Sequence, residues 1–213
     1  MFFPLRLTPF EEYMLLDDQP TYPMSCFFML KLRGDFNVTV FQSALQNTLE
    51  HHPLLTCSVQ NVKGIFFWKY IDTPLLIVRL PLDEERRFPP TKGIDLFREP
   101  ALRITVCNKN TDPATVNLED QTNIIFEVHH SACDAAGIVR FAEDALCDYA
   151  FRQGFTEAQR EAVDPDLLSR RGTFGKPRNS ILRMLPKQFF GICRAWTFLM
   201  NRVVALSPVI IKK

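Results

Sequence analysis

Two adjacent histidines and a nearby aspartate form the cluster best suited to chemistry. They lie in residues 129–137, which read HHSACDAAG. A histidine near its ordinary pKa can accept a proton from a hydroxyl or an amine at neutral pH. Successive side chains of a strand point to opposite faces, so His129 and His130 are expected to point apart. The pair therefore suits one structural and one reactive histidine, and it argues against a metal ion held by both.

The aspartate of the cluster, Asp134, stands where a helix is predicted to begin. A carboxylate is a favourable cap there, because the first backbone N–H groups of a helix lack partners. The bare pattern also fits two structural histidines at the end of a strand. Cys133 beside His130 has two interpretations, a nucleophile or a small apolar residue, and we favour the apolar one.

Alternating strands and helices would position this cluster. Apolar and β-branched runs predict strands at 26–32, 54–59, 65–70, 75–80, 101–106 and 123–129. Apolar residues three or four apart predict one helix that begins after Asn37 or Thr39 and ends near His52, and a second over 134–151. Residues 61–64 read as a turn, and 83–93 and 108–121 as loops. This order predicts a layered α/β or α+β domain.

Charge is divided unevenly along the 213 residues. Residues 1–166 carry 15 Lys or Arg and 24 Asp or Glu, whereas residues 167–213 carry 10 Lys or Arg and no acidic residue. Residues 164–180 read as a linker rich in Pro, Gly, Arg and Ser. Residues 181–206 then predict a basic amphipathic helix. This helix would contact a membrane surface or a lipid, or would pack on a further half of the protein. We do not expect it to bind nucleic acid, because it carries no known nucleic-acid-recognition motif.

Composition limits the class of protein. Hydrophobic residues are 46% and charged residues 23% of the chain, values typical of a globular domain. The six cysteines show no CxxC spacing, so we expect free thiols in a reducing compartment. The N-terminus does not resemble a signal peptide, and no apolar run reaches 18 residues. We therefore expect a cytoplasmic protein. If residues 181–206 contact a membrane surface, the protein would be peripheral to the membrane.

The cluster and its flanks resemble the CoA-dependent acyltransferase superfamily. This superfamily includes chloramphenicol acetyltransferase, condensation domains, alcohol acetyltransferases and wax-ester synthases. HHSACDAAG is similar to the family's HHxxxDG motif. LTPFEEYMLLDD and FQSALQNTLEHHPLL are similar to its opening segment and first helix, and EPALRITV and NIIFEVHH to the strands before the motif. The resemblance covers residues 7–150 and implies a chloramphenicol acetyltransferase-like half, with a mixed sheet flanked by helices.

The resemblance implies a role for each matching residue. His130 matches the family's general base, and His129 matches the first histidine, which is usually structural. Asp134 matches the aspartate whose salt bridge shapes the site. Arg103 is the candidate for the other side of that salt bridge.

Two positions depart from the family pattern, and two are candidates to line the substrate tunnel. Ala135 stands where the motif has glycine, and the backbone there would be strained if it needed a positive φ. Ala135 and Gly137 are candidates to line the substrate tunnel. Thr56 stands where many relatives have an arginine.

The layout resembles an N-terminal half. Most monomeric relatives have two similar halves, with the tunnel between them, and about twice this length. No DFGWG-like sequence is present, and 76 residues follow the motif. We expect an acyltransferase-like half-domain at 1–163, the linker at 164–180, and at 181–213 the basic helix with a crossover segment toward a second half.

The implied reaction is acyl transfer from a thioester, acyl-CoA or carrier-bound, to a hydroxyl or amine, with no metal and no bound cofactor. The second half would come from the same or another chain, and the acceptor would be a small molecule or a lipid. The 213-residue chain alone is expected to be inactive. Two alternatives stay open: a non-catalytic half that acts as a binding module, and a homo-oligomer with sites between subunits.

Overall fold

The computed structural model describes five stretches of the chain, residues 3–71, 77–82, 92–108, 121–158 and 166–173. The chain divides into two units, Met1–Gly172 and Thr173–Lys213. Every helix and strand below belongs to the first unit, apart from Thr173 at the end of the last short helix. The predicted basic helix at 181–206 and the crossover segment lie outside the described residues.

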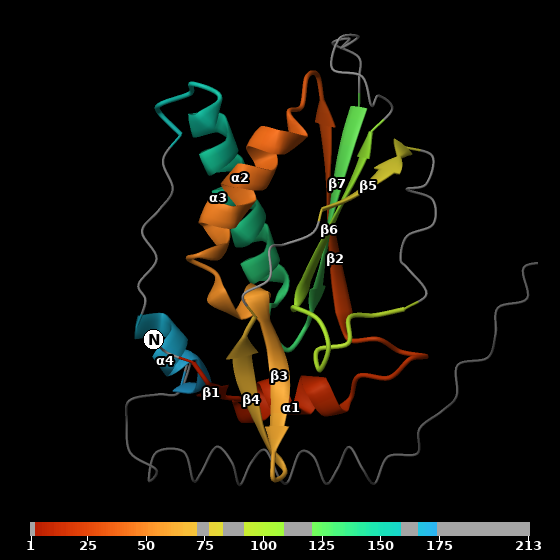
Figure 1. Cartoon of the computed structure of the whole chain (residues 1–213), viewed down its shortest axis with the longest axis vertical. Coiled ribbons are helices and arrows are strands. Elements are labelled where there is room, and N and C mark those ends of the chain that lie inside the picture. Colours follow the sequence, from red (N-terminus) through yellow and green to blue (C-terminus); the bar gives the residue numbers. More distant parts are fainter. Residues whose placement is uncertain (1–2, 72–76, 83–91, 109–120, 159–165, 174–213) are drawn as a thin grey trace, which may run out of the picture. The chain divides into compact units, whose positions relative to one another are not determined.

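A four-stranded mixed sheet carries the histidine motif at the end of a central strand (Figure 1). The strand order is β2-β7-β6-β5. β7 (Gln121–His129) pairs antiparallel with both β2 (Ser25–Arg33) and β6 (Leu102–Asn108). β5 (Ile77–Pro81) is parallel to β6 and makes the sheet mixed, as the family resemblance implies.

Two helices cover one face of this sheet, α2 (Val38–Leu49) and α3 (Ala135–Arg152). The Asn37 side chain caps α2 by accepting the backbone N–H of Val40, which supports the predicted helix start. Apolar residues at helical spacing turn inward and meet alternate residues of the strands. The resulting core contains Val38, Phe41, Leu45, Leu102, Ile104, Val106, Ile124, Phe126, Val128, Ile138, Phe141 and Ala145.

A smaller antiparallel sheet has the order β1-β4-β3. It consists of β1 (Leu5–Arg6), β3 (Cys57–Val62) and β4 (Ile65–Tyr70). Lys63 and Gly64 join β3 to β4 with positive φ angles of 51° and 84°, which is the requirement of a tight two-residue hairpin turn. A turn is therefore confirmed within 61–64, but it is formed by Lys63 and Gly64, and residues 61–62 still belong to β3.

Residues 94–101 connect the two sheets through backbone hydrogen bonds. Val59 N–H donates to Leu96 O at 2.6 Å, and Ala101 N–H donates to Cys57 O at 3.1 Å. His129 N–H in turn donates to Ala101 O at 3.0 Å. The first histidine of the motif is thus tied to the small sheet as well as to the large one.

The segment before β3 differs from the prediction. Residues 54–56 were expected in a strand, but Pro53–Thr56 form a 3-10 helix, η1, and β3 begins only at Cys57. α2 also ends at Leu49, before the predicted end near His52. A residue that precedes proline avoids the α conformation, and His52 has φ −124° and ψ 58°. The chain therefore leaves α2 early and makes a tight extra turn.

The predicted linker at 164–180 contains folded structure. Asp166–Arg170 form helix α4, and Arg171–Thr173 form a 3-10 helix, η4. The Arg171 guanidinium donates to the Glu11 carboxylate, with Nε 2.7 Å from Oε1 and Nη2 3.2 Å from Oε2. This ion pair fastens the end of the first unit to its beginning.

Glu11 belongs to helix α1 (Pro9–Leu16), which has a capping box with Thr8. The Glu11 carboxylate accepts Thr8 N–H at 2.8 Å and Trp68 Nε1–H at 3.0 Å, in addition to Arg171. Trp68 is completely buried and anchors the core of the small sheet. Glu11 therefore holds together α1, β4 and η4.

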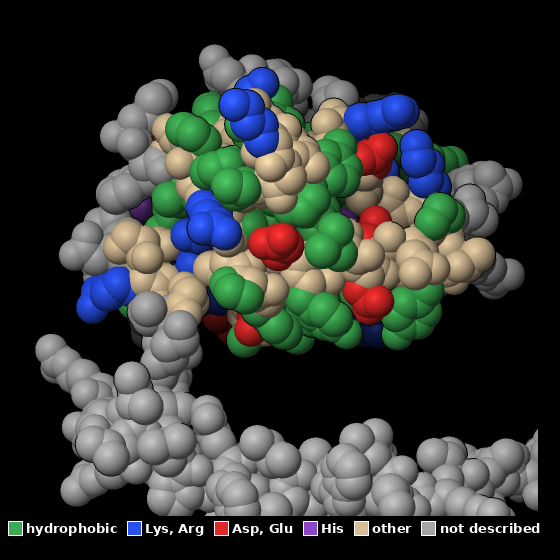
Figure 2. Space-filling model, turned by 90° about the horizontal axis from the view of Figure 1, so that it is seen from below, with side chains coloured by type: hydrophobic (Ala, Val, Ile, Leu, Met, Phe, Trp, Pro, Cys, Tyr) green, Lys and Arg blue, Asp and Glu red, His purple; other side chains and the backbone are tan. Residues whose placement is uncertain are grey.

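The surface exposes several large apolar side chains. On α1, Phe10, Tyr13 and Leu16 are 61%, 58% and 64% exposed. Figure 2 views the molecule from below and shows hydrophobic side chains on this face, interspersed with acidic and basic ones. Among the described residues, no helix is both long enough and apolar enough to cross a membrane.

Candidate active site

Backbone hydrogen bonds from separate parts of the chain fix the histidine motif. Besides the bond from His129 N–H to Ala101 O, His130 N–H donates to Met24 O at 2.7 Å. Ala132 N–H folds back onto His129 O at 2.9 Å and makes a tight turn. Backbone hydrogen bonds alone therefore fix the position of the motif backbone.

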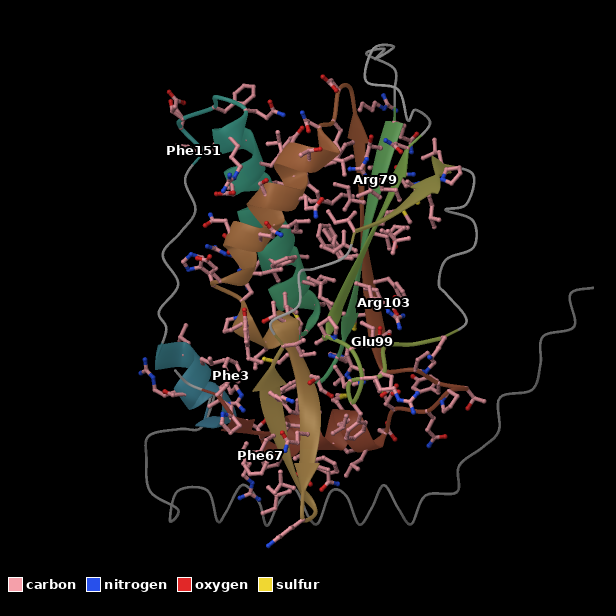
Figure 3. All side chains as sticks on the ribbon, in the orientation of Figure 1. Phe3, Phe67, Arg79, Glu99, Arg103 and Phe151 are labelled. Atoms are coloured by element: carbon pink, nitrogen blue, oxygen red, sulfur yellow. The ribbon has the colours of Figure 1, made fainter. Side chains whose placement is uncertain are left out.

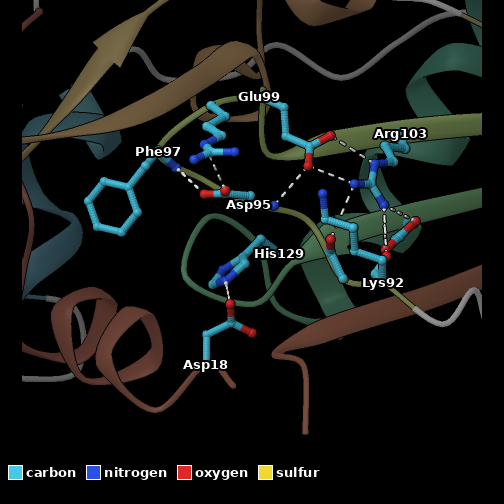
Figure 4. Close-up of polar contacts among 10 residues, drawn as sticks. Asp18, Lys92, Asp95, Phe97, Glu99, Arg103 and His129 are labelled. Carbon is cyan, nitrogen blue, oxygen red and sulfur yellow. Dashed lines mark hydrogen bonds and ion pairs between the residues drawn. The ribbon is translucent and has the colours of Figure 1, made fainter. Parts of the chain in front are cut away.

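His129 is completely buried. Val128 packs in the core with α2 and α3, so alternation along β7 turns His129 to the other face of the sheet, where it faces Asp18 (Figure 4). Its Nδ1 lies 3.2 Å from the backbone N–H of Ser131, which can only donate. The proton of the neutral ring must therefore be on Nε2, which faces Asp18 Oδ2 at 3.7 Å. Burial lowers the pKa of His129, although the Asp18 carboxylate opposes this, and a nearby His130 lowers it further. Burial thus favours the neutral ring of His129, and its structural role stays a prediction.

His130 is partly exposed, and its ring has the opposite tautomer. Nδ1 lies 3.2 Å from the carbonyl oxygen of Cys133, which can only accept. The neutral ring therefore carries its proton on Nδ1, and Nε2 keeps its lone pair. A neutral imidazole with a free Nε2 is the form that accepts a proton from an attacking group.

Asp134 caps helix α3, as its position in the sequence predicted. Its Oδ1 accepts the Gly137 N–H at 2.7 Å, and the side chain is exposed. The predicted salt bridge between Arg103 and Asp134 is wrong, because Arg103 pairs with two other carboxylates. Asp134 shapes the site through the start of α3 rather than through a buried ion pair.

Arg103 lies in a dense polar network beside the motif (Figures 3 and 4). Its guanidinium is 2.6 Å from Glu99 Oε1 and 3.3 Å from Glu127 Oε2, and it also donates to the backbone carbonyls of Lys92 and Gly93. Arg103 and Glu127 are directly opposite each other in the β6–β7 register. Burial raises the pKa of Glu127, against the lowering effect of Arg103. The arginine thus compensates a nearly buried carboxylate.

The remaining motif residues have simple roles in packing. Ala135 begins α3, is exposed, and has no positive φ, so the alanine in place of glycine causes no backbone strain. A Cβ on Gly137 would lie 2.7 Å from Cys133 Sγ, so a close approach explains this glycine. Burial raises the pKa of the Cys133 thiol to about 12, which disfavours a nucleophilic thiolate. The tunnel positions of Ala135 and Gly137 stay a prediction.

Thr56, which stands where many relatives of the resembled family have an arginine, serves η1. Its hydroxyl donates to Pro53 O at 2.9 Å within the 3-10 helix. No charge is therefore supplied to the motif from this position.

Sequence reasoning missed the residues around His129. Met24 O accepts the His130 N–H, and Asp18 bonds to the Met24 N–H and faces Nε2 of His129. Both residues are more than a hundred positions away from the motif in the chain. No spacing rule connects Asp18 to residue 129. The only available signal was the adjacent pair Asp17–Asp18 in the segment that resembles the family's opening.

Loss of the Asp134 cap should have a modest effect on stability. Replacing Asp134 with Ala should lower the free energy of unfolding by about 0.5–2 kcal/mol, because the Gly137 N–H loses its acceptor at an exposed helix end. Asp134→Ser restores a capping oxygen and should recover most of the loss. Urea unfolding of the two variants measures both values. A loss well above 3 kcal/mol for Asp134→Ala would instead indicate a buried ion pair.

Comparison of the chain with known proteins gives matches only at the level of structure. No family model and no curated protein matches its sequence. The SgcC5 protein from Streptomyces globisporus superposes with a TM-score of 0.65 at 18% identity, over 94% of this chain and 47% of that one. A variant of the starter condensation domain of rhizomide synthetase RzmA, in complex with C8-CoA and Leu-SNAC, gives a TM-score of 0.68 at 14% identity, over 90% and 45%.

The chain has a condensation-domain-like fold. A third neighbour agrees, in the complex of the X-domain and OxyB from teicoplanin biosynthesis, with a TM-score of 0.63 at 18% identity over 96% of this chain and 44% of that one. The resemblance inferred from the motif is thus confirmed for the fold. The chain spans less than half the length of each of these condensation-domain-like neighbours.

Proposed function

We propose that the chain is the N-terminal half of an acyltransferase that moves an acyl group from a thioester to a hydroxyl or amine. The observation that carries this proposal is the His130 tautomer. The Cys133 carbonyl holds the ring proton on Nδ1, so Nε2 is free to act as general base. The condensation-domain-like fold and the C8-CoA complex of one neighbour support a thioester donor, either acyl-CoA or a carrier-bound acyl group.

In the proposed reaction, Nε2 of His130 takes the proton of the acceptor O–H or N–H. The acceptor oxygen or nitrogen attacks the thioester carbonyl carbon, and the C–S bond breaks from the resulting tetrahedral intermediate. The departing thiolate takes the proton back from His130 and leaves as a thiol. A general base of this kind contributes about 10²–10⁴-fold to the rate.

The proposed partners follow from the length of the neighbours. A second half, from the same or another chain, would complete the substrate tunnel and supply donors for the oxyanion of the intermediate. Exposed apolar side chains such as Phe10, Tyr13 and Leu16 are available for association. We place the protein in the cytoplasm, with 181–206 as the candidate contact to a membrane surface or a lipid acceptor.

A complementation assay tests this proposal. The chain alone, given octanoyl-CoA and a panel of amines and alcohols, should release no free CoA above background. Addition of the C-terminal half of a condensation domain in trans should bring acceptor-dependent CoA release. A monomeric 213-residue chain that transfers acyl groups unaided would contradict the half-enzyme proposal and favour a complete small acyltransferase.

One observation favours a second candidate function. A neighbour of the same fold, the X-domain, is seen in complex with OxyB, so this fold also occurs in a protein-binding context. The alternative is a non-catalytic half that serves as a binding module. It predicts stable capture of a protein partner, with affinity that is unchanged in His130→Ala.

A further inference from the structure

The carboxylate of Asp18, in the loop between α1 and β2, faces the ring of His129 and is linked to the backbone of His130 through Met24. Its Oδ1 accepts the Met24 N–H at 2.7 Å, and the carbonyl of the same Met24 accepts the His130 N–H at 2.7 Å. Its Oδ2 lies 3.7 Å from Nε2 of His129 (Figure 4). One side chain therefore holds the backbone at His130 and faces the ring of His129.

The contact with His129 is electrostatic rather than a hydrogen bond. At 3.7 Å, Nε2 is beyond hydrogen-bond range, and this buried atom has no hydrogen-bond partner in the structure. An N–H directed at a carboxylate is favourable, whereas a lone pair directed at it is not. The charge of Asp18 thus selects the tautomer that leaves Nδ1 unprotonated.

That tautomer matters for the turn that follows. Nδ1 of His129 accepts the Ser131 N–H, and this bond, with the backbone bond from Ala132 N–H to His129 O, closes the turn. The turn places the Cys133 carbonyl against Nδ1 of His130. If the His129 ring flipped or changed tautomer, the Ser131 bond would be lost and the turn would loosen.

We propose that Asp18 is a positioning residue for His130: it fixes the His129 tautomer and the His130 backbone, and so presents His130 with a free Nε2. The proposal rests on the proposed function of His130 as the base. Asp18 is not expected to touch substrate, and its effect passes through His129 and Met24.

The test uses the full chain with Asp18→Asn. The amide oxygen can still accept the Met24 N–H, but an uncharged amide NH₂ now faces the His129 Nε2–H, so donor meets donor. Asp17→Asn is the matched control, since it removes the same charge one residue away at the C-cap of α1. Imidazole ¹⁵N shifts, measured on the four histidines, report the tautomer of each ring directly.

We expect His129 and His130 each to show one tautomer in the parent chain and in Asp17→Asn, and a mixture in Asp18→Asn. Asp18→Glu, which keeps the charge, should shift the tautomers less than Asp18→Asn. In the complemented enzyme, Asp18→Asn should lower kcat about tenfold with KM nearly unchanged, which is less than the roughly 10²-fold that a misplacement of about 1 Å can cost.

Unchanged ring tautomers in folded Asp18→Asn would overturn the proposal, and so would an unchanged kcat. A melting curve shows whether Asp18→Asn is folded, and so distinguishes loss of fold from loss of positioning. If Asp18→Asn does not fold, the ring tautomers are measured in Asp18→Glu instead. Failure of the proposed function would appear differently, as full activity in His130→Ala, while the tautomer result would still stand.

Discussion

Replacing His130 with Ala should lower the rate of acyl transfer in the assembled enzyme by about 10²–10⁴-fold. The acceptor then has no base to take its proton. In the parent chain, the bond from Nδ1 to Cys133 O keeps the ring proton on Nδ1 and leaves Nε2 to act as that base. Binding of the thioester should change little, so the loss should appear mainly in kcat. Steady-state CoA release under saturating donor measures it.

The chain offers a matched control for this substitution. His51 is an exposed histidine that lies two residues after the end of α2, outside the motif. His51→Ala should leave kcat within about twofold of the parent value, because most substitutions at the surface have small effects. Equal activity in both variants would exclude His130 as the base.

Replacing Arg103 with Ala should be the most destabilising change near the motif. It leaves Glu127, whose side chain is only 5% exposed, without its compensating charge. Arg103 is itself 30% exposed, so the loss should lie near the lower end of the roughly 3–5 kcal/mol that breaking a buried pair costs. Chemical unfolding at pH 7 measures the loss. Arg98, 83% exposed in its pair with Asp95, is the control, and Arg98→Ala should cost less than about 1 kcal/mol.

The pH dependence of this loss has a definite sign. Burial already raises the pKa of Glu127 in the folded state, and removal of Arg103 should raise it further. A raised carboxyl pKa means that the folded protein binds the proton more readily than the unfolded chain, so acidification favours folding. The Arg103→Ala loss should therefore shrink from pH 7 to pH 4, and Arg103→Ala/Glu127→Gln should recover part of it at pH 7. A loss that grows on acidification would contradict this account.

Local rules predicted the elements that depend on near neighbours. Asn37 and Asp134 are caps because each side chain bonds to a backbone N–H three residues on. The strand that ends at His129 followed from a short apolar run, and strand alternation correctly separated a buried His129 from a partly exposed His130. These inferences needed only the order of a few residues.

Contacts that depend on sheet register or chain crossing could not be predicted. Arg103 was assigned to Asp134, yet strand pairing places it opposite Glu127, a residue that sequence alone showed only as part of a buried strand. Asp18 faces His129 across 111 positions of the chain. Such pairs follow from three-dimensional alignment of distant segments, and no single-sequence pattern encodes that alignment.

The bond between Glu11 and Arg171 joins residues 160 positions apart. During synthesis Arg171 is made 160 residues after Glu11, so Glu11 and Trp68 are both made before this counter-charge is available. The four-stranded sheet and its two helices, complete by Arg152, can form before that moment. The ion pair that fastens α1 to η4 can therefore form only after every residue of that sheet and its helices has been made.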